Sequence, residues 1–128
     1  MDLKNTILGA SDLPTKKLYI PEWGCDIWIL TLTGSERDAF EASIIGKNGK
    51  ADNLENLRAR FAVLVIGNED GSRAFKDSDA PELTKKSAAT LDKIMDIGKA
   101  HNRMWDSFDV DGLAKNSESV PSESIGFD

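Results

Sequence analysis

A stripe of large apolar side chains recurs at helical spacing between residues 54 and 65. Its members stand 0, 3, 7, 10 and 11 positions from the first, and these offsets place them on one face of an α-helix: Leu54, Leu57, Phe61, Leu64 and Val65. A helix with so apolar a face has to bury it against other elements. We therefore predict a central helix that begins near Asp52 or Asn53, with Phe61 and Leu64 in the core.

Two β-strands are predicted before this helix. Residues 16–20 form a short extended stretch, and Pro21–Gly24 combine a fixed φ with a permissive glycine, as turns do. The second strand is expected over Asp26–Leu32, where β-branched and aromatic residues occupy both faces. This composition indicates that helices cover at least one side of the sheet.

A capping box predicts a helix directly after the second strand. Thr33 and Glu36 have the spacing at which their side chains satisfy the free amides of a first helical turn. The helix is expected to run to about Ile45, with Phe40 and Ile44 on its buried face.

The second half of the chain is predicted to hold a small hairpin and a long helix. A polar turn at 68–72 precedes a brief strand over Arg73–Phe75, and a short helical turn follows through Leu83. The last helix is expected over Ser87–Arg103 and to pack on the central helix, where Gly98 either weakens it or allows a close helix contact.

These elements predict an α+β fold in which a small antiparallel sheet of hairpins packs against three to four helices. Residues 1–15 are assigned to a flexible N-terminal arm and residues 16–106 to a single α+β domain. Residues 107–128 are assigned to a disordered acidic tail, because this Ser/Glu/Pro-rich stretch has too few apolar residues to offset the entropy of ordering.

Charge and composition exclude several classes of function. The net charge is −6, of which residues 106–128 carry −5, so neither part has the positive field that nucleic-acid binding requires. The apolar run Phe61–Ile66 has six residues against the roughly 20 that span a bilayer, and the N-terminus lacks a signal-peptide pattern. The single cysteine, Cys25, allows no internal disulfide and no thiolate zinc cage. We expect a cytoplasmic protein without nucleic-acid or membrane partners.

The sequence indicates no catalytic, cofactor-binding or metal site. His101 is interpreted as an ordinary, partly exposed side chain, and Cys25 as a core-facing or strand-edge thiol. Gly49-Lys50-Ala51 lacks the first glycine and the hydroxyl of a phosphate-binding loop. Acidic pairs such as Asp92 and Asp96 are read as solvated helix faces. We therefore expect a protein that is not an enzyme and needs no cofactor.

Large apolar side chains supply the candidates for a protein-binding surface. Tryptophan and methionine are enriched at protein contacts, and the candidates are Trp28, Met95, Met104 and Trp105. The alternative is that these side chains fill a small core.

Several short motifs follow one another in a characteristic order. Pro21-Glu22-Trp23-Gly24 stands before Leu32-Thr33-Gly34-Ser35-Glu36-Arg37-Asp38-Ala39-Phe40-Glu41, and Leu57-Arg58-Ala59-Arg60 leads into the apolar helix. After these come Glu69-Asp70-Gly71 with Arg73 and Phe75, then Asp79, and a last helix that ends near Asn102. In this order and spacing, residues 18–102 resemble the tail assembly chaperones of long-tailed (siphovirus) bacteriophages, specifically their short non-frameshifted product. The stretch after Trp105 has no counterpart.

The resemblance implies a non-catalytic chaperone that acts in the host cell cytoplasm and is absent from the mature virion. It implies binding to the tape measure protein, which is kept soluble while the tail tube protein polymerises around it. A longer product of ribosomal frameshifting would make the main contact with the tail tube protein. We also expect a homo-oligomer, and apolar contacts with a long helical partner.

Two alternatives come from other classes of function. The first is a generic protein-binding adaptor domain unrelated to virion assembly. The second is a small enzyme subunit whose Asp and Glu side chains come together only in the fold.

Overall fold

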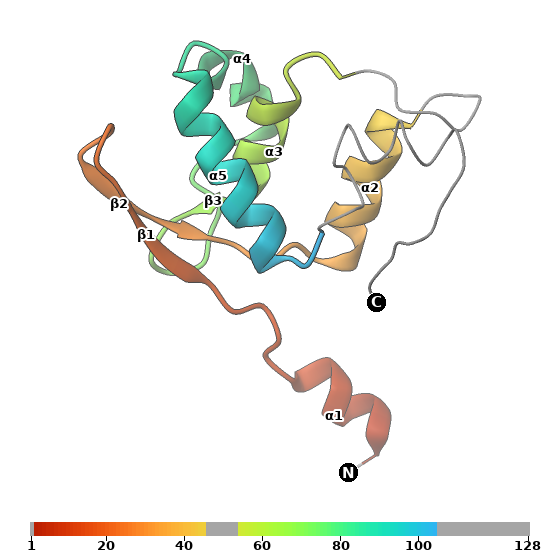
Figure 1. Cartoon of the computed structure of the whole chain (residues 1–128). Helices are drawn as coiled ribbons and strands as arrows, with labels where there is room; N and C mark the ends of the chain where they lie inside the picture. Colours follow the sequence, from red (N-terminus) through yellow and green to blue (C-terminus); the bar gives the residue numbers. More distant parts are fainter. Residues whose placement is uncertain (1, 46–53, 105–128) are drawn as a thin grey trace, which may run out of the picture.

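The computed structural model describes residues 2–45 and 54–104, in which a small antiparallel sheet lies against helices (Figure 1). The sheet has three strands in the order β1-β2-β3: β1 (Lys16–Ile20), β2 (Cys25–Ile29) and β3 (Ile66–Gly67). The predicted α+β fold is confirmed. The predicted acidic tail, residues 107–128, lies outside the described residues.

The β1–β2 hairpin forms where the sequence predicts it. Ile20 pairs with Cys25 across a turn at Pro21–Gly24, and Gly24 has a φ of 65°, which a glycine adopts without strain. β2 ends at Ile29 rather than at Leu32. It ends early because the next residues bond to other elements: the Leu30 N–H donates to the carbonyl oxygen of Val65 at 2.8 Å, and the Leu32 N–H to the Asn102 side chain at 2.8 Å.

The capping box sets the start of α2 (Gly34–Ile44) as predicted. The Glu36 N–H donates to Thr33 Oγ1 at 3.1 Å, and the Thr33 N–H donates to Glu36 Oε1 at 2.9 Å. Phe40 and Ile44 are the buried residues of this helix. The predicted buried face of α2 is therefore confirmed.

The central helix, α3 (Leu57–Val65), begins later than predicted. The expected start at Asp52 or Asn53 lies outside the described residues, and Leu54 precedes the helix with 36% of its surface exposed. The helix cannot extend back through Asn56, because that residue takes a left-handed φ of 58°. Phe61 is fully buried as predicted, whereas Leu64 is only half-buried.

The predicted second hairpin is shorter than expected. The turn is present, since the Asn68 N–H donates to the carbonyl oxygen of Ser72 at 2.8 Å. Beyond it, the predicted strand over Arg73–Phe75 is reduced to a single bridge between Arg73 and Gly67. The chain continues through the 3-10 helix η1 (Asp77–Asp79) into the short helix α4 (Ala80–Leu83).

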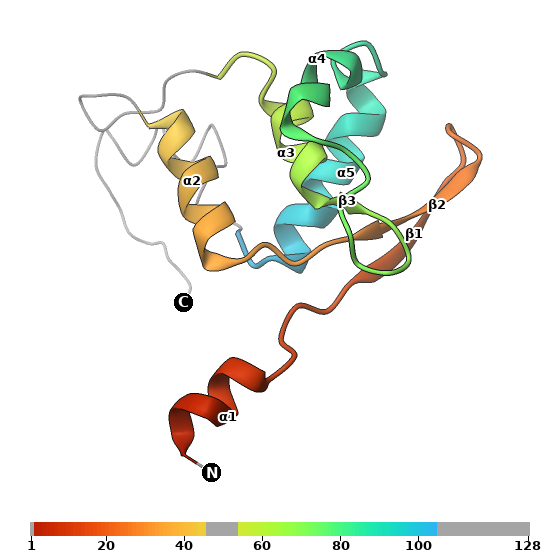
Figure 2. The ribbon, with the colours of Figure 1, turned by 180° about the vertical axis from the view of Figure 1, so that it is seen from behind.

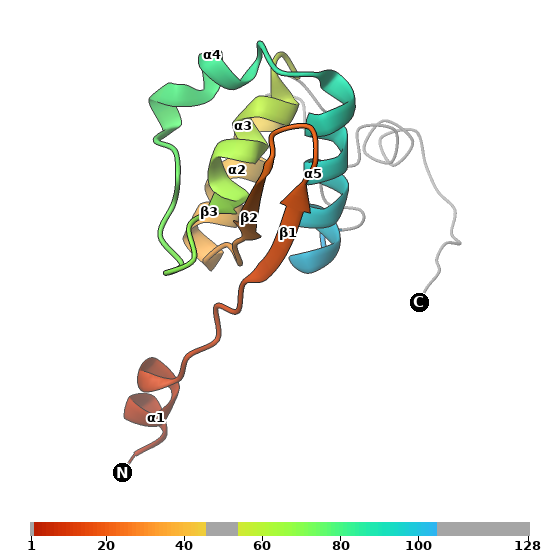
Figure 3. The same ribbon diagram turned by 90° about the vertical axis from the view of Figure 1, so that its left-hand side faces the viewer.

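The last helix, α5 (Ala88–His101), starts at the predicted Ser87, whose side chain accepts hydrogen bonds from the amides of residues 89 and 90. It packs beside α3 and along one side of the hairpin (Figures 1 and 3). The tip of the hairpin is tied to α5 by Lys93 Nζ, which lies 3.1 Å from Glu22 Oε1. A backbone hydrogen bond and this ammonium group lower the pKa of the Glu22 carboxyl.

The two faces of the sheet differ in what covers them. Ile20, Ile27 and Ile29 are buried in the core that the helices complete. Because side chains alternate along a strand, the neighbouring residues point to the opposite side, which we call the outer face: Lys17, Tyr19, Asp26 and Trp28.

The N-terminal arm contains a helix that the sequence does not predict. Asp2 caps α1 (Leu3–Gly9) by accepting a hydrogen bond from the Asn5 N–H at 2.8 Å. None of the side chains of α1 is buried, and the helix projects from the rest of the molecule in the views from front and back (Figures 1 and 2). The arm is therefore partly helical and adds nothing to the core.

Gly98 lies where α3 and α5 approach each other closely. A Cβ at this position would lie 2.8 Å from Cε2 of Phe61 and 3.3 Å from Cγ2 of Val65. Of the two roles that the sequence allows for Gly98, the structure supports the close helix contact.

We expect Gly98→Ala to destabilise the protein by about 1 kcal/mol. Alanine gains about 1 kcal/mol of helix propensity, but overpacking a core costs about 1–3 kcal/mol, and the fully buried Phe61 ring has little room to shift. Urea unfolding followed by circular dichroism measures the difference. Gly34→Ala is the matched control, because a Cβ there meets nothing within 4 Å. A Gly98→Ala variant more stable than the parent would mean that helix propensity outweighs the close contact.

Candidate protein-binding surfaces

The structure separates the four binding candidates. Met104 and Met95 are 0% and 9% exposed and belong to the hydrophobic core. Trp28 is half-buried on the outer face, and Trp105 lies outside the described residues. The alternative that large apolar side chains fill the core therefore describes Met95 and Met104, and this corrects their placement on an open surface.

Met104 reaches the core because the chain reverses at the end of α5. Arg103 takes a left-handed φ of 56°, and the Met104 N–H donates to the carbonyl oxygen of Lys99 at 2.8 Å. Such a turn satisfies a free carbonyl of the last helical turn and bends the chain back. The helical stripe in the sequence gives no sign of this reversal.

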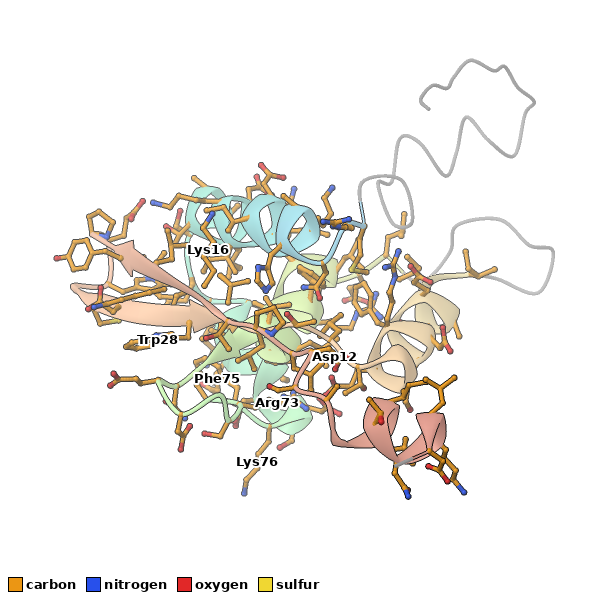
Figure 4. The ribbon with its side chains drawn as sticks, turned by 90° about the horizontal axis from the view of Figure 1, so that it is seen from below. Asp12, Lys16, Trp28, Arg73, Phe75 and Lys76 are labelled. Atoms are coloured by element: carbon orange, nitrogen blue, oxygen red, sulfur yellow. The ribbon has the colours of Figure 1, made fainter. Side chains whose placement is uncertain are left out.

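The outer face presents an aromatic centre with charged neighbours. Lys17 Nζ lies 5.8 Å from the centroid of the Trp28 ring and 3.8 Å from Asp26 Oδ2. Tyr19 is 56% exposed, and Trp28 is not among the side chains that pack on the core. In Figure 4, Trp28 lies on the part of the hairpin farther from α5. This arrangement resembles the composition of protein contact sites, with an aromatic residue inside a polar rim.

A groove with a volume of about 480 Å³ runs between α2 and α3, and we call it the α2–α3 groove. Its apolar lining comes from three helices: Ala39, Phe40, Val63, Leu64 and Ala80. Its polar lining comprises Ser35, Glu36, Ser43, Arg60, Arg73 and Asp77. Arg73 is held there by Asp77 at 2.7 Å and by the carbonyl oxygen of Val63 at 3.1 Å.

A smaller hollow of about 170 Å³ continues the groove toward the N-terminal arm. It shares Glu36, Leu64 and Arg73 with the groove, and Leu13 and Thr15 of the arm also line it. Neither space is predicted from the sequence, since the lining residues come from separate elements. Leu64, at the edge of the helical stripe, is the residue that could have indicated an open face.

His101 has a structural position at the root of the arm. Its Nε2 lies 2.9 Å from Thr31 Oγ1 and 3.0 Å from the carbonyl oxygen of Pro14. Cys25 is exposed at the start of β2, so this thiol is not packed in the core, although strand alternation places it on the same face as Ile27. Within residues 2–45 and 54–104, no group of three or more His, Cys, Asp or Glu side chains is placed to hold a metal ion.

Across the same residues, no helix has the length and apolar character that crossing a bilayer requires.

Comparison with known proteins gives a structural match. No protein-family model and no curated protein matches the sequence. Among solved structures, the chain is similar to the bacteriophage HK97 tail assembly chaperone, with a TM-score of 0.53 and 13% sequence identity over 74% of this chain and 88% of that chain. At this identity the match speaks for the fold alone, and the chain has a fold like that of a phage tail assembly chaperone.

Proposed function

We propose that this chain is a non-catalytic tail assembly chaperone of a long-tailed phage, the short non-frameshifted product. In this role it binds the tape measure protein, keeps it soluble and promotes tail tube assembly around it. The observation that supports the proposal most directly is the similarity of its fold to that of the HK97 tail assembly chaperone. The order of motifs over residues 18–102 supports it independently.

The outer face is the surface that we assign to the tape measure protein. A long amphipathic helix offers an apolar stripe bordered by charges, and Trp28 with its neighbours Lys17 and Asp26 offers the complementary pattern. Tryptophan is the residue type that most often contributes strongly to binding. Trp105 remains a further candidate, although it lies outside the described residues.

Other parts of the proposal concern assembly and location. The chain self-associates, and the tail tube protein is contacted mainly through a longer frameshifted product. The protein acts in the host cell cytoplasm and is absent from the mature virion. These statements rest on the resemblance of residues 18–102 to the tail assembly chaperones.

Co-expression with the tape measure protein of the same phage tests the proposal. We expect the tape measure protein to become soluble, to co-purify with this chain, and to stay bound in about 0.5 M salt, which screens exposed charge pairs. Trp28→Ala should weaken the complex about ten-fold or more, which corresponds to about 1.4 kcal/mol. Trp28→Phe should retain most of the binding. Leu54→Ala, at an exposed apolar residue that precedes α3, is the control and should bind as the parent does.

Three results would count against this assignment. A tape measure protein that is equally soluble alone, or that never co-purifies, would favour the generic adaptor domain instead. Dissociation in 0.5 M salt would shift the contact from Trp28 to the acidic residues 107–128.

A further inference from the structure

The N-terminal helix α1 carries apolar side chains that no other part of the described structure covers. Leu3, Ile7 and Leu8 are 73%, 60% and 72% exposed. Leu3 and Ile7 are four residues apart and therefore share one side of the helix, and Leu8 lies at the border of that side. A helix of seven residues is marginal in water on its own. Packing its apolar side against another surface would stabilise α1.

The arm that carries α1 is anchored beside the α2–α3 groove. The carbonyl oxygen of Pro14 accepts a hydrogen bond from Thr31 Oγ1 and lies 3.0 Å from His101 Nε2. Leu13, 49% exposed, lines the hollow that continues the groove. Beyond this anchor, α1 stands clear of the rest of the molecule in three views (Figures 1, 2 and 3).

The α2–α3 groove has the shape to receive aliphatic side chains. Ala39 is exposed and Ala80 is half-buried, and both line the groove together with the half-buried Leu64. Small side chains beside a larger one leave a hollow on a helical surface, and packing between helices fills such hollows with the large side chains of the partner. The groove and the hollow beside it have volumes of about 480 and 170 Å³.

We propose that α1 of one copy docks in the α2–α3 groove of a second copy, with Leu3, Ile7 and Leu8 against the apolar lining around Leu64. This inference rests on the self-association proposed above and names its two surfaces. The occupant is a second copy because α1 stands clear of its own chain in all three views (Figures 1, 2 and 3), and none of its side chains is buried there.

The proposed contact joins two different surfaces, an arm and a groove, so each copy offers one of each. Two copies that exchange arms form a closed dimer. Without such an exchange, the same contact repeats from one copy to the next and forms a longer assembly. A variant that lacks either surface therefore cannot associate with itself. Two variants that lack different surfaces can still form one contact with each other.

Sedimentation velocity of the full chain over a range of concentrations tests the inference. Ile7→Glu places a charge in the apolar stripe of α1, and Ala39→Glu places one in the groove at an exposed helical position that tolerates it. The matched controls add the same charge to the same helices outside the contact: Asn5→Glu on α1 and Ala42→Glu on α2. Circular dichroism verifies that every variant is folded.

We expect the parent and both controls to associate as concentration rises, and Ile7→Glu and Ala39→Glu each to stay monomeric. An equimolar mixture of these two variants should form a heterodimer and nothing larger. Association of Ile7→Glu or Ala39→Glu at the parent's level, or a mixture that stays monomeric, would overturn the arm-in-groove contact and leave self-association standing. A parent that is monomeric at every concentration would overturn both the arm-in-groove contact and self-association. This is the result expected if α1 docks in the groove of its own chain.

Discussion

Phe61→Ala should lower the free energy of unfolding by about 3–5 kcal/mol, the cost of removing a large aromatic side chain from a core. The Phe61 side chain is 0% exposed, its ring centroid lies 5.4 Å from that of Phe40, and its edge contacts the position of Gly98. The substitution thus opens a cavity where α2, α3 and α5 meet. Since small domains have about 5–15 kcal/mol of stability in total, the variant should unfold at much lower urea concentration, as circular dichroism would show.

Leu54→Ala is the control for this prediction. Leu54 belongs to the same apolar stripe in the sequence, but it is 36% exposed and precedes α3. We expect its substitution to change stability by no more than about 0.5 kcal/mol, as at most surface positions. Equal costs at Phe61 and Leu54 would show that the stripe is buried along its whole length. An unchanged Phe61→Ala variant would place this side chain against a partner instead of the interior.

Asn102→Ala should lower the free energy of unfolding by about 2–3 kcal/mol, because buried backbone groups lose their partners. The Asn102 side chain accepts a hydrogen bond from the Leu32 N–H at 2.8 Å and donates to the carbonyl oxygens of Leu30 and Gly98 at 3.1 and 3.0 Å. Leu30 and Leu32 are buried, so water reaches their backbone groups poorly. The same urea unfolding measurement gives the loss of stability.

Two further variants test whether the loss of stability comes from the three hydrogen bonds of Asn102, which we call the Asn102 bridge, or from losing any amide side chain. Asn68→Ala removes an exposed side chain that donates to Ser72 Oγ at 3.1 Å, and we expect a loss of about 0.5 kcal/mol or less. Asn102→Asp keeps the acceptor for the Leu32 N–H but cannot donate to the two carbonyl oxygens, so it should destabilise nearly as much as alanine. An Asn102→Ala variant with the stability of Asn68→Ala would show that the bridge contributes little.

Local chemistry in the sequence determined the elements whose signals lie within a few residues. The capping box at Thr33 and Glu36 set the start of α2, Ser87 set the start of α5, and Pro21–Gly24 set the hairpin turn. The stripe around Phe61 identified the core because helical spacing alone shows which side chains share a face.

Among the binding candidates, the sequence indicated the residue types but not which of them stay accessible. Trp28 lies on the outer face because strand alternation points it away from Ile27 and Ile29. Met104 is buried because the chain reverses at Arg103, a conformation that non-glycine residues adopt only where the surrounding structure holds it. The α2–α3 groove was not foreseen, since no local pattern shows where two packed helices leave a space.

The bonds that close this fold join residues about 70 positions apart, such as Thr31 with His101 and Leu32 with Asn102. The sequence by itself determined the helices, the hairpin and their apolar faces, because these depend on neighbours along the chain. Only the tertiary structure decided that Phe61 packs against Gly98, that His101 lies within hydrogen-bond distance of the Pro14 carbonyl oxygen, and that the side chains of α1 stay exposed. The physical reason is that periodicity shows which face is apolar, whereas what covers that face depends on segments distant in sequence.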